Sequence, residues 1–168
     1  MSAQLDRLKV LLVYSNAKMA RLVKTVLRAF GMKEFQEAFS ADQARESMRT
    51  FRPDIVILSA NLEDGEYDEF VRWVRNDHDC PAPTTPIIIT SSRAHRQAVI
   101  EAISSGADEF MSMPIIPGAL AKRIEAVIFK PRPYIRAPGY FGPCRRRMRD
   151  KTYKGEERRQ RQPTQKEA

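Results

Sequence analysis

The chain has 168 residues, of which 42% are hydrophobic and 30% are charged, and its formal net charge is +8. This length accommodates one domain of ordinary size with an appendage, and the composition is that of a soluble globular protein. No apolar run approaches the roughly 20 residues that a membrane span needs, and the N-terminal segment does not resemble a signal peptide. We therefore expect a cytoplasmic protein with no membrane segment.

Five β-rich runs alternate with five segments of helical apolar spacing along the first 129 residues. This order predicts an α/β fold, a (βα)5 doubly wound parallel sheet with helices on both faces. Three of the runs are continuously apolar, as expected for strands buried on both faces, whereas the second is more polar and suits an edge. The predicted strands are Val10–Tyr14, Glu34–Phe39, Asp54–Leu58, Pro86–Ser91 and Glu109–Met113.

The helices between these strands have recognisable ends. The first stops at Gly31, which suits a C-terminal cap, and Ser40 with Gln43 resembles a capping box at the start of the second. The apolar spacing places the other three helices at about 67–75, at 98–105 before Gly106, and at 120–128.

The charge is divided unevenly along the chain. Residues 1–129 hold 16 Lys and Arg against 17 Asp and Glu, whereas residues 130–168 hold 13 against 4, a net charge of +9. The second part is rich in Pro, Gly, Arg and Gln and poor in aliphatic residues, so it cannot form a core of its own. We predict a folded domain over 1–129 and a basic, irregular, flexible tail over 130–168.

Cys80 and Cys144 lack the spacing of metal ligands and are expected to be free thiols.

Three segments resemble the receiver domain of two-component response regulators, close to the single-domain chemotaxis-regulator type. They are RPDIVIL (52–58), PIIITSS (86–92) and GADEFMSMP (106–114). The resemblance extends over residues 8–129 and implies a flavodoxin-like receiver fold. GYFGPCRRR (139–147) also resembles tails that follow receiver domains in some bacteria.

The resemblance implies a phosphorylation site in which most functional residues are replaced. Receivers accept a phosphoryl group on an aspartate after the third strand, beside magnesium held by acids after the first strand. Tyr14 and Ser15 stand at the acidic pair, Ser59 at the phosphoacceptor and Met113 at the lysine, whereas Ser91 keeps the family's hydroxyl. A serine is a poor nucleophile without an adjacent base. These replacements predict a degenerate pseudo-receiver with no metal, no cofactor and no enzymatic activity.

Several residues are candidates for partner contacts. Phe110 matches the family's aromatic switch position, and Met111, Ile115 and Ile116 surround the end of the fifth strand, a region that receivers use for dimerisation or docking. Burial in the core is the competing interpretation for each of them. In the tail the candidates are Tyr140, Arg145, Arg146 and Arg147.

These features together favour a protein-binding module of two-component signalling that acts without phosphorylation, with a homodimer as a further expectation. The sequence also allows two alternatives. In the first, the chain is a phosphorelay receiver with an unorthodox acceptor. In the second, it is a regulator that binds nucleic acid through the basic residues of 130–168.

Overall fold

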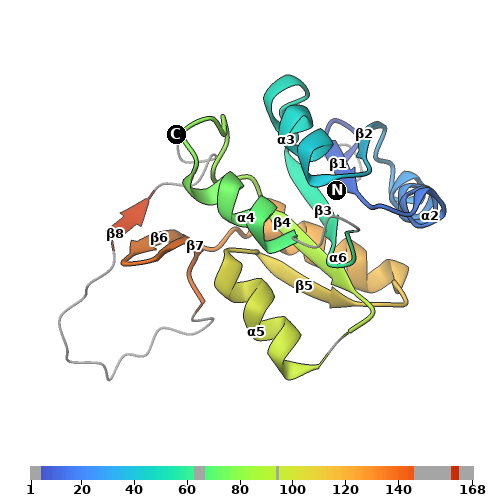
Figure 1. Cartoon of the computed structure of the whole chain (residues 1–168). Helices are drawn as coiled ribbons and strands as arrows, with labels where there is room; N and C mark the ends of the chain where they lie inside the picture. Colours follow the sequence, from blue (N-terminus) through green and yellow to red (C-terminus); the bar gives the residue numbers. More distant parts are fainter. Residues whose placement is uncertain (1–4, 63–66, 94, 146–159, 163–168) are drawn as a thin grey trace.

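A computed structural model describes residues 5–62, 67–93, 95–145 and 160–162. The core of the fold is a five-stranded parallel sheet in the order β2-β1-β3-β4-β5 (Figure 1). This arrangement confirms the predicted doubly wound sheet and the edge position of the second strand. The strands are β1 (Lys9–Val13), β2 (Glu34–Ala38), β3 (Ile55–Ser59), β4 (Ile87–Ser91) and β5 (Glu109–Ser112), each within one residue of its predicted ends.

Helices cover both faces of this sheet. Alternate side chains of the central strands enter two separate cores, so that Leu11 and Leu58 pack on one face and Leu12 and Ile57 on the other. Both sets are fully buried, which is why these strands read as continuous apolar runs. The first core contains residues of α3 (Ala41–Thr50), α4 (Tyr67–Asn76) and α5 (Arg96–Ser105), and the second contains residues of α2 (Ala17–Ala29) and α6 (Pro117–Phe129).

The helix ends follow the predicted local chemistry. The Ser40 hydroxyl accepts a hydrogen bond from the backbone N–H of Gln43, at 3.2 Å, and caps α3. The Gln43 side-chain oxygen in turn accepts a hydrogen bond from the backbone N–H of Phe39, at 2.9 Å. In a standard capping box this donor would be the N–H of the N-cap residue, Ser40. Gly31 and Gly106 have φ angles of +93° and +110°, so both occupy the left-handed conformation that closes a helix.

The prediction of an irregular tail is wrong for residues 134–143. Strands β6 (Tyr134–Ala137) and β7 (Tyr140–Pro143) form an antiparallel hairpin that lies beside α4 (Figure 1), and β8 (Gln160–Gln162) pairs antiparallel with β6. The turn is Pro138–Gly139, with φ +72° at the glycine. Four large side chains of the hairpin are at most 8% exposed, so the folded unit extends beyond residue 129: Tyr134, Ile135, Tyr140 and Phe141.

Candidate functional site

The carboxyl ends of parallel strands meet at one edge of the sheet, and the predicted site positions lie there. Tyr14 directly follows β1, and Ser59 and Ser91 are the last residues of β3 and β4. Met113 directly follows β5 and precedes a cis peptide bond to Pro114. The fold therefore brings the ends of these four strands to the edge where a receiver carries its phosphorylation site.

A buried hydroxyl pair joins the strands that flank β3. The Tyr14 hydroxyl lies 2.8 Å from the Thr90 hydroxyl, and Tyr14 is only 3% exposed. Thr90 in turn donates to the carbonyl of Leu58 on β3, at 3.3 Å. Burial raises the pKa of Tyr14 to about 12, although the hydrogen bond with Thr90 opposes that rise. The residue is therefore neutral at physiological pH and ties β1 to β4 across the intervening strand.

A second set of hydrogen bonds surrounds the phosphoacceptor position. The Ser15 hydroxyl donates to the carbonyl oxygen of Asn61, at 3.0 Å, and the Asn61 N–H donates to the Ser59 hydroxyl oxygen, at 3.1 Å. The Asn61 side-chain amide donates to Ser92, also at 3.1 Å. The Asn61 carbonyl therefore already accepts a hydrogen bond from Ser15, which stands where the resemblance to receivers implies an acid.

This set of donors does not fit magnesium. Mg²⁺ is held in proteins by carboxylates, whereas Tyr14, Ser15 and Ser59 offer only neutral hydroxyl groups. Across the part of the chain that the structure describes, no group of three or more His, Cys, Asp or Glu side chains is arranged to hold a metal ion. Both cysteines are free thiols, as expected.

The remaining polar group of the site is engaged by its own loop. The Ser91 hydroxyl accepts from the N–H of Arg93, at 3.0 Å, and donates to the carbonyl of the same residue, at 3.2 Å. Such a local bond is common for serine at the end of a strand. Met113 is half-buried, and its thioether carries no charge at the position where the resemblance implies a lysine.

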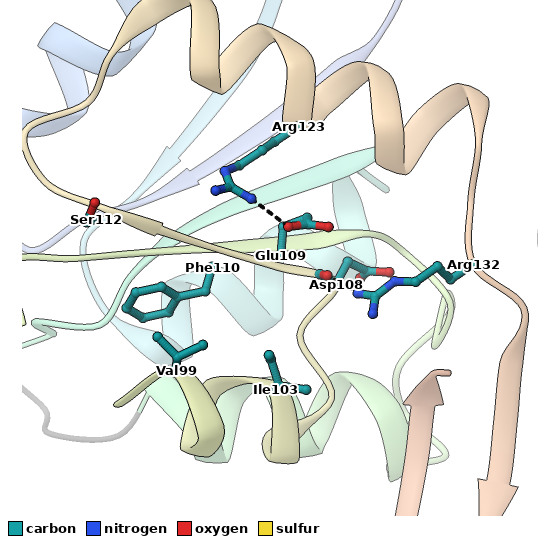
Figure 2. A pocket seen from close by; sticks show the side chains of 8 residues that line it. All are labelled: Val99, Ile103, Asp108, Glu109, Phe110, Ser112, Arg123 and Arg132. Atoms are coloured by element: carbon teal, nitrogen blue, oxygen red, sulfur yellow. Dashed lines mark hydrogen bonds and ion pairs between the residues drawn. The ribbon is translucent and has the colours of Figure 1, made fainter. Parts of the chain in front are cut away.

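A shallow groove of about 340 Å³ runs along β5, the edge strand between α5 and α6 (Figure 2). Val99 and Ile103 of α5 form one wall, and Phe110 lies half-buried against them. On the opposite side a guanidinium nitrogen of Arg123 lies 2.7 Å from the Glu109 carboxylate. The groove thus combines an apolar wall with a charged one. It is completed by Asp108, Ser112 and Arg132.

The structure separates the predicted contact residues. Ile116 is 64% exposed and Ile115 is half-buried, so both remain candidates. Met111 is 4% exposed and packs in the core with α6, and Tyr140 is 8% exposed within the hairpin. For these two residues the prediction of a surface contact is wrong, because their side chains are used for packing. Arg145 is exposed, and its guanidinium lies 4.1 Å from the centre of the Tyr140 ring, whereas Arg146 and Arg147 lie outside the described residues.

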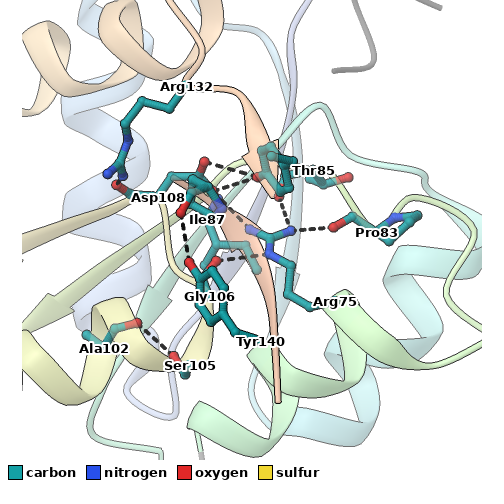
Figure 3. Close-up of polar contacts among 12 residues, drawn as sticks. Arg75, Pro83, Thr85, Ile87, Ala102, Ser105, Gly106, Asp108, Arg132 and Tyr140 are labelled. Carbon is teal, nitrogen blue, oxygen red and sulfur yellow. Dashed lines mark hydrogen bonds and ion pairs between the residues drawn. The ribbon is translucent and has the colours of Figure 1, made fainter. Parts of the chain in front are cut away.

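A buried ionic cluster lies at the amino end of the sheet and was not anticipated (Figure 3). The guanidinium of Arg75 is 2.9 Å from the Asp108 carboxylate, and it also donates to the carbonyls of Gly106, Pro83 and Thr85 at 2.7–2.9 Å. The same carboxylate accepts from the N–H of Ile87, at 2.8 Å. The sequence did contain one signal that Arg75 is buried, because this residue follows Val71 by one helical turn and so lies on the buried stripe of α4.

The hairpin closes this cluster. The Tyr134 hydroxyl lies 3.0 and 3.1 Å from the two Asp108 carboxylate oxygens, and the Arg75 guanidinium lies 5.1 Å from the centre of the Tyr134 ring. Burial raises the pKa of Asp108, and the charge of Arg75, the Ile87 N–H and the Tyr134 hydroxyl oppose that rise. A buried ion pair is tolerated when its remaining polar atoms are hydrogen-bonded, as they are here.

Comparison with known proteins agrees with this geometry. A family model described as the response regulator receiver domain matches residues 10–125. The chain belongs to this family. The parallel sheet and its helices therefore form a receiver domain of two-component systems. The hairpin lies beyond the residues that the family model matches.

The chain resembles both regulators about twice as long as the matched segment and a regulator that the match covers almost completely. It is 31% identical over 119 residues to the KDP operon transcriptional regulatory protein KdpE of Escherichia coli, a match that covers 71% of this chain and 50% of KdpE. The DNA-binding response regulator MtrA of Mycobacterium tuberculosis is 30% identical over 122 residues, with the same coverage. The chain thus spans about half the length of these relatives. Chemotaxis protein CheY-3 of Vibrio cholerae is 24% identical over 120 residues, which are 91% of its length.

Solved structures show the same fold. A putative response regulator from Chloroflexus aurantiacus superposes with a TM-score of 0.67 at 23% identity, over 73% of this chain and 98% of that one. A CheY-like receiver domain from Methanospirillum hungatei superposes with a TM-score of 0.65 at 19% identity, over 74% and 96%. Within the described residues of our chain, every helix is too short or too polar to cross a bilayer.

Proposed function

We propose that this receiver acts as a protein-binding module of a two-component pathway without being phosphorylated, and that it catalyses no reaction. The observation that carries this proposal is the buried contact between Tyr14 and Thr90, at 2.8 Å. It stands where the family requires an acid, and it joins β1 to β4 through neutral groups. Transfer of a phosphoryl group requires its developing charge to be neutralised, and the hydroxyls of Tyr14, Ser15 and Ser59 carry no charge to hold a metal for that purpose.

The groove between α5 and α6 is the docking face in this proposal. Val99, Ile103 and Phe110 form its apolar wall. The two helices that contribute lining residues also carry exposed apolar side chains, Ile100 within α5, 45% exposed, and Ile116 at the N-cap of α6, 64% exposed. Exposed apolar side chains on the elements of a groove are typical of a surface that buries against a partner. The partner is a signalling protein, and a second copy of this chain is an alternative occupant that sedimentation would reveal.

Incubation with acetyl phosphate and magnesium, followed by mass spectrometry of the intact chain, tests the proposal. We expect no added phosphoryl group. The matched variant is Ser59→Ala, which removes the only hydroxyl at the phosphoacceptor position. If the wild-type protein gained a phosphoryl group that Ser59→Ala lacked, the chain would be a phosphorelay receiver with an unorthodox acceptor and the proposal would fail.

The charge of residues 130–168 supports a second candidate function, binding to nucleic acid. The segment carries a net charge of +9, and Arg136 and Arg145 hold their guanidinium groups 4.4 and 4.1 Å from the ring centres of Phe141 and Tyr140. Filter binding of a single-stranded DNA oligonucleotide at low and high salt tests it, since phosphate contacts weaken steeply with salt. The variant that replaces Arg145, Arg146 and Arg147 by Gln should bind more weakly. Equal binding by both proteins would exclude this function for the arginine run.

A further inference from the structure

The width of the groove along β5 depends on one short connection. Val99 and Ile103 of α5 form the apolar wall together with Phe110 of β5, and Glu109 of β5 belongs to the charged wall. Residues 106–108 join the end of α5 at Ser105 to the start of β5 at Glu109. A displacement of this connection that shifts α5 relative to β5 would therefore change the shape of the groove.

The hairpin holds this connection from one side. The Tyr134 hydroxyl contacts both oxygens of the Asp108 carboxylate, and Arg132, two residues before β6, donates to the Asp108 carbonyl oxygen. Arg132 also lines the groove itself. A Cβ atom placed on Gly142 would lie 3.1 Å from the Cα of Gly106, so the backbones of the hairpin and the connection are in direct contact.

Helix α4 holds the same connection from the other side. Arg75 is 1% exposed, and it binds the Gly106 carbonyl at 2.9 Å and the Asp108 carboxylate at 2.9 Å. The Arg75 guanidinium also lies over the Tyr134 ring. The connection is therefore clamped between α4 and the hairpin, and the hairpin supplies the half of the clamp that lies outside the matched family domain, which ends at residue 125.

We propose that the β6–β7 hairpin is a positioning element for the β5 groove: its docking on Asp108 sets the relative position of α5 and β5 and couples the basic C-terminal segment to the docking face. This inference rests on the proposed use of the groove for partner binding. It assigns a role to the hairpin that the receiver fold alone does not require. A ligand of the C-terminal segment that pulls the hairpin away would then loosen the groove, and a partner in the groove would favour the docked hairpin.

Amide hydrogen exchange of the full chain tests the coupling without a partner. Tyr134→Phe removes the hydroxyl that contacts Asp108 and keeps the ring. Tyr140→Phe is the matched control, because it removes a buried hydroxyl of the same hairpin whose hydrogen-bond partners are the Pro143 carbonyl, at 2.8 Å, and the Arg145 side chain, both outside residues 106–112. We expect Tyr134→Phe to raise exchange about tenfold at residues 106–112, as the loss of one charge-assisted hydrogen bond would produce, with β1 unchanged as the reference. Tyr140→Phe should leave residues 106–112 unchanged.

Two results would overturn the inference. One is an effect of Tyr134→Phe confined to residues 134–143, and the other is an equal effect of both variants on residues 106–112. Arg132→Gln provides a second route to the same measurement, because it removes the donor to the Asp108 carbonyl and should also accelerate exchange at residues 106–112. The measurement involves neither phosphate nor partner. Failure of the coupling is thus distinguishable from failure of the phosphorylation-independent function, which the acetyl phosphate experiment tests.

Discussion

Replacement of Arg75 by Met should destabilise the receiver severely. The guanidinium forms the ion pair of the Asp108 side chain, at 2.9 Å, and is the largest favourable charge on it, ahead of Arg132. It also satisfies the carbonyls of Pro83, Thr85 and Gly106. Its removal leaves a fully buried carboxylate with only neutral donors, and it leaves these carbonyls with fewer donors. Breaking a buried ion pair in this way typically costs about 3–5 kcal/mol. That is a large part of the roughly 5–15 kcal/mol by which domains are stable.

The same helix offers a matched control. Arg72 pairs with Asp68 one turn earlier, at 3.0 Å, but its side chain is 64% exposed. Exposed pairs with this spacing contribute about 0.3–0.5 kcal/mol, so Arg72→Met should have an effect roughly ten times smaller than Arg75→Met. Urea unfolding followed by circular dichroism measures both variants. With a slope of about 1–3 kcal/mol per molar urea, the midpoint of Arg75→Met should fall by on the order of 1–5 M.

The effect of Arg75→Met should also depend on pH. Burial raises the folded-state pKa of Asp108 above its unfolded value, and loss of Arg75 removes the largest opposing influence. The folded state then binds more protons than the unfolded state, so stability rises as the pH falls through the interval between the two pKa values. The destabilisation should therefore be greatest at neutral pH and shrink in acid. A variant within about 1 kcal/mol of Arg72→Met at neutral pH would refute the reasoning.

Three further predictions follow from the site and the clamp. The Tyr14 side chain ionises near pH 10 in the unfolded chain but near pH 12 in the folded one, so the wild-type protein should lose about 3 kcal/mol of folding stability between these values. Tyr14→Phe should abolish this loss, and urea titrations across that pH range measure it. Gly106→Ala should cost about 1–3 kcal/mol in thermal unfolding, because φ is +110° and the new Cβ would lie 3.0 Å from Arg75, whereas Gly118→Ala, with no atom within 4 Å, should be harmless. Magnesium with a phosphoryl mimic should leave the melting temperature unchanged; a clear rise would contradict the neutral site.

The local sequence was sufficient to predict the receiver fold. The continuous apolar runs of β1, β3 and β4 indicate strands buried on both faces, and the cap residues Ser40, Gly31 and Gly106 mark helix ends within a residue or two. These signals are local, because each depends on the pattern of neighbouring side chains and on backbone preferences. The hypothesis that the family's acids and lysine are replaced likewise depends on single positions and can be stated without a structure.

The contacts made by those replacements were not predictable. The resemblance predicted that Tyr14 and Ser15 stand at the family's acidic positions, but it gave no indication of the Tyr14–Thr90 and Ser15–Asn61 bonds, which join residues 76 and 46 positions apart. Only the order of the strands brings such residues together. In the same way, Met111 was a candidate for partner contact, although the face of β5 on which it lies buries it against α6.

The composition of residues 130–168 concealed the hairpin. The abundance of charge and proline indicates an irregular chain, and by itself the segment has too little apolar surface to form a core. Tyr134 and Phe141 are buried because α4 and the connection before β5 provide the other half of their packing, together with an ion pair that needs the Tyr134 hydroxyl. Sequence alone thus determined the sheet, its helices and the neutral residues at the strand ends, since these depend on local patterns and single positions. The hairpin and the clamp depend on contacts between distant residues, and only the tertiary structure decided them.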